Sequence, residues 1–438
     1  MSQYESSKHA DCYSFLNSII EYIQNSKVQK ITYEDLKEVA IDFLQKGHSQ
    51  DQSERYETLT QLIFKFIDGK ASESVLSFYL KRQFAMEEFT LDEIINKLKL
   101  VISKDALVDQ SITFADNFSY PKVSVIITTY NRKEYLLQAI NSILAQDYPN
   151  IEIITIDDNS SDGTDLLMEE HFKNHPRIIY IRKEQNCGPG TNRREAFKAY
   201  ADGEYTLFLD DDDYLIDPNY ISKTVNFHMN HPEISFVAAN VFLEYSLKDL
   251  LKISDLGLSE VVNKYDYLLN FERPGFPKPL STLTTLFKRD SLIEMGILNM
   301  NMVNDASIYM RALLVGNAGF IDSVVGVYRI HGNNITFNLS KEFIVENLDE
   351  KTIVKNMAIE QFGFNKKDMD KWFNYTVHNT VSYYLVNSAR NAEDFRYMFN
   401  WTKENCPFIY KDLRQTYRFT LLKKRLLKFP LVKKLRGK

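Results

Sequence analysis

Hydrophobic residues recur with two different periods along the chain. In residues 1–115 they return every three to four positions, as at Phe15, Ile19 and Ile23, which is the pattern of amphipathic helices. From Tyr120 onward, short apolar and β-branched runs alternate with stretches of helical periodicity. The runs are VSVIITTY (123–130), IEIITID (151–157), RIIYIR (177–182) and EYTLFLD (204–210). Each run predicts a buried β-strand.

Strands that are apolar on both faces and alternate with helices form mostly parallel sheets covered by helices on both sides. The pattern therefore predicts an α/β domain over residues 118–338. We expect residues 1–117 to form a helical accessory domain. We expect residues 339–438 to form a helical C-terminal region that ends in a basic amphipathic tail.

Polar residues follow all four predicted strands, at the end where a parallel sheet binds its ligands. Because these ends lie along one edge of the sheet, residues far apart in the sequence should converge on one cleft. The four strand ends are 128–132, 157–164, 186–194 and 210–213.

The fourth strand end carries four consecutive aspartates, residues 210–213. One interpretation is a solvated acidic turn, because the following Asp217-Pro218 is typical of a helix start. The other is a cation site, since adjacent carboxylates repel one another unless a cation neutralises them. Oxygen ligands suit Mg²⁺ or Mn²⁺, with substrate phosphates as further ligands. The position directly after an apolar strand favours the metal.

The second and third strand ends are compatible with a nucleotide. Asp157-Asp158 is either a cap of the next helix, where Asp162 and Thr164 are good start residues, or a carboxylate pair that accepts hydrogen bonds from a base or ribose. The glycines of loop 188–190 allow a close approach to phosphate before a helix. The loop matches neither the P-loop nor GxGxxG, which disfavours an ATPase or a dehydrogenase.

Composition restricts the class of protein and its expected location, but it does not indicate a reaction. The 438 residues are 44% hydrophobic and carry a net charge of -6, which suits globular domains and disfavours a nucleic-acid partner. Cys12, Cys187 and Cys406 form neither a zinc pattern nor a disulfide framework, and the first residues do not resemble a signal peptide. No apolar run reaches the roughly 20 residues that span a bilayer. We expect a cytoplasmic protein, either soluble or peripheral on the inner face of the membrane.

Three motifs together resemble a known family. VSVIITTYNR, IDDNSSDGT and LDDDDYLIDP, in this order and spacing, are similar to the motifs of the family 2 glycosyltransferases of the GT-A fold, over roughly residues 121–335. The resemblance implies a Rossmann-like, mostly parallel sheet with helices on both faces. It also implies a bacterial-type, inverting enzyme that uses a nucleotide-diphosphate sugar and Mn²⁺ or Mg²⁺.

The resemblance assigns nucleotide-binding residues by position. Thr128 and Tyr130 match residues that line the nucleobase pocket, and Asp158 matches the residue that binds the base, most often uracil. The family's arginine after the third strand falls on Arg193 when counted from the loop and on Arg194 when counted back from the fourth strand, with Arg193 preferred.

The resemblance also assigns the residues around the diphosphate. Asp210 and Asp212 match the outer residues of the DxD motif, which hold ribose and the diphosphate-bound metal, and Asp212 is expected to be the direct metal ligand. Asp211 between them belongs to the donor-binding set. Residues 331–334 are similar to the family's terminal HxxN element, so His331 is expected to reach the metal or diphosphate. A purely structural histidine is the alternative.

One further carboxylate matches the family's general base. Asn304-Asp305 stands where the family often has Glu-Asp before a helix, so Asp305 is the expected catalytic base unless it serves only as a helix cap. Asn304 replaces the Glu, which leaves open any role of a second carboxylate there. One base and one metal, without an enzymic nucleophile, imply direct displacement with inversion. The QxxRW motif of processive members is absent, which favours transfer of a single sugar.

The resemblance implies a hexosyltransferase-type enzyme in cell-surface polysaccharide, glycolipid or glycoprotein synthesis. The expected donor is a UDP-sugar, and the expected acceptor is a hydroxyl of a glycan, a lipid-linked carrier or a protein. The alternative is a non-catalytic sugar-nucleotide-binding or assembly protein. A nucleotidyltransferase is disfavoured, because it should carry a basic glycine-rich loop where this chain has TTYNRKEY.

The flanking regions add hypotheses about partners. Basic and apolar residues interleave over 411–438, as in helices that lie on an anionic membrane surface. Docking of this helix on the protein's own acidic surface is the alternative. Segment 242–282 is expected to help form the acceptor pocket, and the N-terminal helices are candidates for homo-oligomer formation.

Overall fold

The computed structural model describes residues 3–26, 30–45, 50–101, 114, 118–301, 303–331 and 340–426. They group into two compact units. The first contains everything described up to Val262, then Pro277–Leu298 and Asn317–His331. The second contains Asn263–Phe276, Asn299–Gly316 and the residues described from 340 onward. The domain boundaries expected from the sequence, at 117 and 338, stay predictions.

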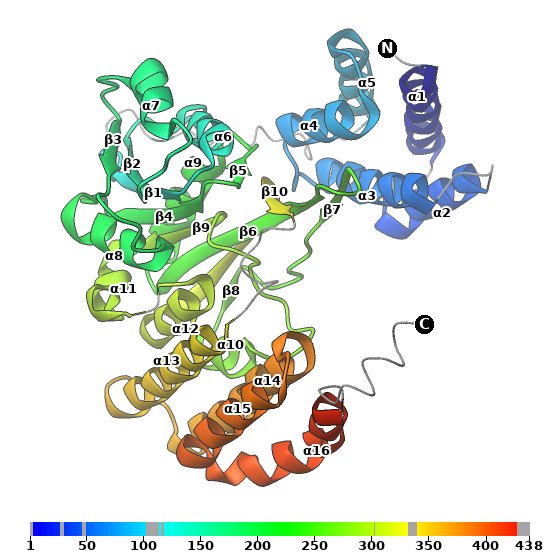
Figure 1. Cartoon of the computed structure of the whole chain (residues 1–438). Coiled ribbons are helices and arrows are strands. Elements are labelled where there is room, and N and C mark those ends of the chain that lie inside the picture. Colours follow the sequence, from blue (N-terminus) through cyan, green and yellow to red (C-terminus); the bar gives the residue numbers. More distant parts are fainter. Residues whose placement is uncertain are drawn as a thin grey trace. The chain divides into compact units, whose positions relative to one another are not determined.

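A ten-stranded sheet forms the centre of the first unit (Figure 1). Its strand order is β3-β2-β1-β4-β9-β6-β10-β5, with β7 paired to β6 and β8 to β10. The neighbours β3, β2, β1 and β4 are parallel, as are β6 and β10, and the other pairs are antiparallel. The bounds are β1 Val123–Thr129, β2 Ile151–Asp157, β3 Ile178–Arg182, β4 Tyr205–Asp210, β5 Tyr214–Leu215, β6 Ile234–Tyr245, β7 Leu250–Ile253, β8 Val261–Val262, β9 Thr285–Lys288 and β10 Asn317–Ile330. The predicted α/β fold with a mostly parallel sheet is confirmed.

Helices cover both faces of this sheet (Figure 1). Leu136 and Ile140 of α6 and Val225 of α9 share one apolar cluster with Val123 and Val125 of β1. Helix α8 contacts β1 and β2 from the opposite face. The bounds are α6 Lys133–Leu144, α7 Thr164–Phe172, α8 Pro189–Ala199, α9 Tyr220–Asn230, α11 Arg289–Glu294 and η1 Ile297–Asn299.

The N-terminal helices belong to the same unit as the sheet, and their helical character is as predicted. Their apolar residues, such as Phe15 and Leu59, form a second cluster that includes Phe242 of β6 and Val324 of β10. The ring of Tyr79 stacks on that of Phe242, with centroids 5.4 Å apart. The bounds are α1 Gln3–Asn25, α2 Tyr33–Leu44, α3 Gln50–Ile67, α4 Glu73–Phe84 and α5 Glu88–Val101. These helices therefore pack on the β6 side of the sheet.

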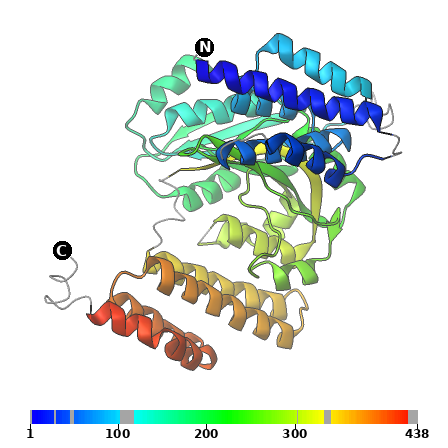
Figure 2. The ribbon, with the colours of Figure 1, turned by 90° about the vertical axis from the view of Figure 1, so that its right-hand side faces the viewer.

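The second unit is helical, as expected for the C-terminal region, and Figure 2 shows its long helices running side by side. A buried ion pair joins two of them, because Arg311 of α12 donates to Glu350 of α13, with 2.9 Å between Nη2 and Oε2. The bounds are α10 Lys264–Asn270, α12 Asp305–Val315, α13 Lys341–Glu360, α14 Lys366–Tyr383, η3 Tyr384–Ser388, α15 Ala392–Asn405 and α16 Pro407–Leu426. Residues 427–438 of the basic tail and 332–339 with the end of the HxxN element lie outside the described residues. No helix of the described part is long and apolar enough to cross a bilayer.

A buried histidine beneath the sheet makes the stability of this fold depend on pH. His228 of α9 is 4% exposed, its Nε2 donates to the Leu286 carbonyl at 2.9 Å, and its Nδ1 has no hydrogen-bond partner among the described residues. Burial lowers the pKa of His228 to about 4. The unfolded chain therefore binds a proton more readily than the folded chain between about pH 6.5 and pH 4, and stability falls as the pH falls through this window.

We expect His228→Gln to reduce this pH dependence, because glutamine keeps a donor for Leu286 but does not titrate. Between pH 7.5 and pH 5, the wild-type free energy of unfolding should fall by about 1–2 kcal/mol more than that of the variant. Urea unfolding at the two pH values measures the difference. Equal losses in the two proteins would contradict the prediction.

Candidate active site

The polar ends of four parallel strands lie side by side at one edge of the sheet. Thr128 of β1 is in register with Asp210 of β4, and Thr129 is in register with Asp157 of β2. Strand β3 continues this edge, with Arg182 beside Asp157. The four segments that the sequence analysis selected are therefore brought together.

The loop after β1 is tied to the loop after β2. The amide of Asn131 donates to Oγ of Ser160 at 2.8 Å, and its Oδ1 accepts the amide of Ser161 at 2.7 Å. Asn131 has a φ of 54°, a conformation that asparagine tolerates better than most residues. Next to this junction, Tyr130 is 48% exposed at the rim, whereas Thr128 is buried.

Asp158 holds the loop that precedes α8. Its Oδ1 accepts the amide of Cys187 at 2.7 Å, and its Oδ2 accepts the amide of Gly188 at 2.8 Å. Gly188 has a φ of 80°, which favours glycine, and Pro189 begins the helix at a position where proline is well tolerated. Asp158 is 3% exposed, so its carboxylate is a fixed, buried acceptor between the second and third strand ends. The sequence did not predict that these backbone amides would be the hydrogen-bond partners of Asp158.

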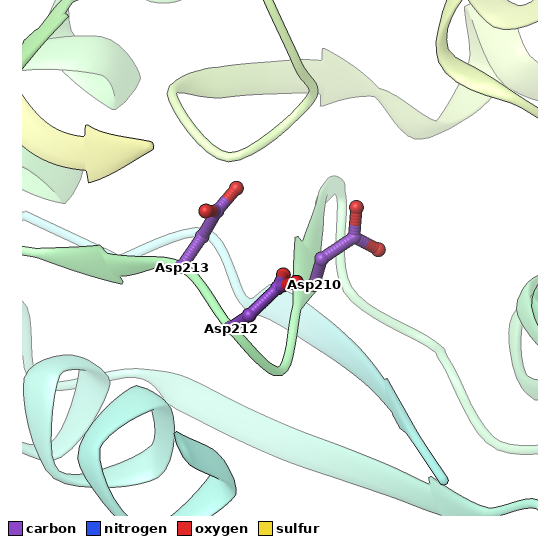
Figure 3. A group of neighbouring side chains, drawn as sticks. All are labelled: Asp210, Asp212 and Asp213. Carbon is purple, nitrogen blue, oxygen red and sulfur yellow. The ribbon is translucent and has the colours of Figure 1, made fainter. Parts of the chain in front are cut away.

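Three of the four consecutive aspartates point to a common place after β4 (Figure 3). Carboxylate oxygens of Asp210, Asp212 and Asp213 all lie within 4.8 Å of one another. Asp213, which the sequence analysis left without a role of its own, is buried and accepts the amide of Arg329 at 3.0 Å. The group offers only oxygen ligands, and this matches the preference of Mg²⁺ and Mn²⁺.

Asp211 lies outside this group, although it shares the contact to Arg132 with Asp212. Its Oδ2 accepts from Oγ1 of Thr129 at 2.7 Å, and its Oδ1 accepts from Nη1 of Arg132 at 3.0 Å. Burial raises the pKa of Asp211 to about 7, Arg132 opposes this rise, and the charge of Asp212 adds to it. Asp211 therefore fastens the acidic turn to β1 in this structure, whereas its expected donor contact stays a prediction.

Cationic and imidazole side chains surround the three grouped carboxylates. Arg132 and His331 both reach Oδ2 of Asp212, at 2.7 Å and 2.9 Å. Buried Arg193 pairs with Asp210 and so lies at the acidic turn, and the assignment of the family's arginine to Arg193 stays a prediction. This positive lining reduces the repulsion between the carboxylates and suits an anionic ligand.

Asp305 lies in the second compact unit, as the first residue of α12. The helix cap is Asn304, whose Oδ1 accepts the amide of Ser307 at 2.9 Å. The Asn that replaces the family's Glu therefore has a structural role here, and Asp305 is not needed as the cap. Its role as general base stays a prediction.

The sequence around this site matches a known protein family. Residues 124–295 match the model of the family described as Glycosyl transferase family 2. The chain is 31% identical over 289 residues to the GalNAc(5)-diNAcBac-PP-undecaprenol beta-1,3-glucosyltransferase of Campylobacter jejuni, covering 64% of this chain and 86% of that protein. The chain belongs to glycosyltransferase family 2. It is a glycosyltransferase, which favours the enzyme over the non-catalytic alternative.

Two further likenesses concern one Staphylococcus aureus protein. This glycosyltransferase is 40% identical over 97 residues to the poly(ribitol-phosphate) beta-N-acetylglucosaminyltransferase TarS, covering 22% of this chain and 17% of TarS. A crystal structure of TarS residues 1–349 in complex with UDP-GlcNAc superposes with a TM-score of 0.51 at 20% identity, covering 64% of this chain and 79% of that one. The structural likeness agrees with the GT-A fold expected from the motifs.

Three residues that shape this site had no individual role predicted from the sequence. Arg132 was inside the quoted TTYNR motif, and its position one residue before α6 was the available signal. Asp213 was part of the acidic run, but only the turn geometry separates it from Asp211. Arg329, two residues before His331, had no signal beyond its place at the end of an apolar strand.

Proposed function

We propose that this glycosyltransferase moves a single sugar from a UDP-sugar to a hydroxyl acceptor, with inversion and with Mn²⁺ or Mg²⁺ as cofactor. The observation that carries the proposal is the group of Asp210, Asp212 and Asp213 at the sheet edge, beside the loop that Asp158 holds. Carboxylates at the ends of parallel strands, next to a loop that begins a helix, suit a nucleoside diphosphate.

The donor site is built from residues of the first unit. Asp212 is the proposed direct metal ligand, with Asp210 and Asp213 beside it and His331 against its Oδ2. A divalent ion bound there would act as a Lewis acid on the leaving diphosphate. Arg132 adds a positive charge at the same carboxylate and would attract the phosphates.

The nucleoside would lie along the first, second and third strand ends. Thr128 and Tyr130 are the proposed lining of the base pocket, and Asp158 is the proposed acceptor for the base N–H. Asp158 already accepts two backbone amides, and each carboxylate oxygen can accept more than one hydrogen bond. Arg193, paired with Asp210, and Asp211 complete the proposed donor set.

Asp305 is the proposed general base. An acceptor hydroxyl is a poor nucleophile at neutral pH, so a carboxylate that takes its proton in the transition state accelerates the attack. A single base and the absence of any proposed enzymic nucleophile imply one displacement at the anomeric carbon and hence inversion.

The acceptor is proposed to be a lipid-linked or polymeric glycan, and protein acceptors remain the alternative expected from the sequence. The names of the two relatives support this, because one states an undecaprenol-linked acceptor and the other states poly(ribitol-phosphate). Sugar transfer at the inner face of the membrane would suit such acceptors. Helix α16 supports this location, since Phe408 and Phe419 are exposed at 81% and 67% and basic residues follow them. Homo-oligomer formation through the N-terminal helices and an acceptor pocket at 242–282 stay proposals.

Nucleotide release tests the proposal directly. We expect Mn²⁺ and a UDP-sugar to give UDP, and EDTA to stop the release. A thermal-shift screen of UDP-, GDP- and dTDP-sugars should show stabilisation by the UDP-sugars, because a bound donor stabilises the fold by mass action. Stabilisation by GDP- or dTDP-sugars alone would contradict the UDP assignment, and release unaffected by EDTA would contradict the metal.

A further inference from the structure

A buried arginine, Arg329, contacts two residues of the acidic turn. Nη1 of Arg329 donates to the carbonyl of Asp212 at 2.5 Å, and its backbone amide donates to Oδ1 of Asp213 at 3.0 Å. Its Nη2 donates to Oε1 of Gln138 on α6. Arg329 is 8% exposed, so its guanidinium is largely removed from water and depends on these partners. The guanidinium and the backbone amide of Arg329 therefore both help to hold the turn that carries the metal candidates.

Two aromatic rings lie close to this guanidinium. It lies 4.8 Å from the ring centroid of Tyr135 and 4.5 Å from that of Tyr214. The Tyr135 ring in turn lies nearly parallel to the imidazole of His331, with 12° between the planes and 6.2 Å between the centroids. The same stack therefore orients His331, whose Nε2 contacts Asp212.

The charge of Arg329 is balanced by a carboxylate that an N-terminal helix also binds. Nε of Arg329 donates to Oε2 of Glu244 on β6 at 3.1 Å. Nη2 of Arg82, on helix α4, donates to Oε1 of the same carboxylate at 2.9 Å. The side chain of Glu244 is only 10% exposed, so the two arginines fix both of its oxygens in a largely buried place. Arg82 also pairs with Asp249, which lies in the turn between β6 and β7, so this arginine is held against the sheet.

We propose that the N-terminal helices position the metal-binding turn through Arg82, Glu244 and Arg329. These three are positioning residues: Arg82 orients Glu244, Glu244 orients Arg329, and Arg329 holds Asp212 and Asp213. Consecutive hydrogen bonds link the three side chains, so a change at Arg82 can alter the position of the acidic turn. The metal part of this inference rests on the proposed function.

Hydrogen–deuterium exchange of the metal-free protein tests the positioning itself. Arg82→Ala should speed exchange in segments 210–215 and 327–331, because the Arg329 amide is protected by Asp213 and the Asp213 amide bonds to the Asp210 carbonyl. The matched control is Lys65→Ala, which removes another pair between an N-terminal helix and a strand, at 2.6 Å to Asp322 on β10. Lys65→Ala should leave both segments at wild-type rates. Similar exchange in the two variants would overturn the proposal.

Mn²⁺ binding in the presence of UDP tests the consequence. Arg82→Ala and Glu244→Gln should each weaken Mn²⁺ about three- to tenfold, and Lys65→Ala should not. The double variant of Arg82 and Glu244 should be no weaker than the worse single variant, since both act through one carboxylate. Additive losses of Mn²⁺ affinity in the double variant would show that Arg82 and Glu244 act independently and would overturn the proposal. If the wild type binds no Mn²⁺, the metal assignment fails and the exchange rates alone decide the positioning role.

Discussion

Asp305→Asn should remove most sugar transfer while the donor still binds. The amide keeps the size of the carboxylate but does not accept the acceptor's proton, and a positioned general base contributes about 10²–10⁴-fold to a rate. We therefore expect kcat to fall by about two to four orders of magnitude. The stabilisation by UDP-sugar with Mn²⁺ in a thermal-shift assay should remain near the wild-type value.

Asn304→Ala is the matched control for this experiment. It removes the cap of the same helix, at a cost of about 1 kcal/mol in stability, and keeps the Asp305 carboxylate. Its kcat should fall far less than that of Asp305→Asn. Turnover of Asp305→Asn close to the wild-type rate would remove Asp305 from the mechanism, and an equal loss in both variants would point to a disturbed helix instead.

Asp212→Asn should abolish the response to Mn²⁺. The substitution removes the negative charge from the middle of the three grouped carboxylates, where Arg132 and His331 already converge. Metal stabilisation of a leaving group is worth several kcal/mol, so kcat/KM should fall about a hundredfold or more. Activity titrated with Mn²⁺ and direct binding of Mn²⁺ with UDP measure the two losses separately.

The neighbouring variant Asp211→Asn tests whether Mn²⁺ binding depends on the three grouped carboxylates or only on the number of acidic side chains in the turn. Asp211 contacts Thr129 and Arg132 and is not part of the group of three carboxylates, so Asp211→Asn leaves Asp210, Asp212 and Asp213 unchanged. Because Asp211 also belongs to the proposed donor set, Mn²⁺ binding is measured here without UDP, and we expect this variant to keep Mn²⁺ affinity within a few-fold of the wild type. A loss as large as that of Asp212→Asn would place Asp211 among the metal ligands and contradict the grouping.

The sheet and the place of the site followed from local patterns in the sequence. Apolar runs such as 123–130 and 151–157 could be recognised because a doubly covered parallel strand has no polar face. The convergence of Asp158 with the 210–213 run then followed from topology, since neighbouring parallel strands end at the same edge. Both inferences needed only short-range patterns and a general rule of the fold.

The contacts between side chains did not follow from the sequence. Arg82, Glu244 and Arg329 are separated by more than 80 residues at each step, at 162 and 85 residues, and only folding brings them together. The division of the acidic run, with Asp211 on one side and Asp213 on the other, depends on a tight turn in which the Asp213 amide bonds to the Asp210 carbonyl at 3.1 Å. Periodicity does not encode such a turn.

The two amides bound by Asp158 set a condition for engineering donor specificity. A loop taken from another family member and inserted at 186–190 would fold correctly only if it presents two backbone N–H groups to the carboxylate at the end of β2. Gly188 has to remain free to adopt its positive φ in such a chimera. Loop 186–190 and residue 158 should therefore be exchanged together.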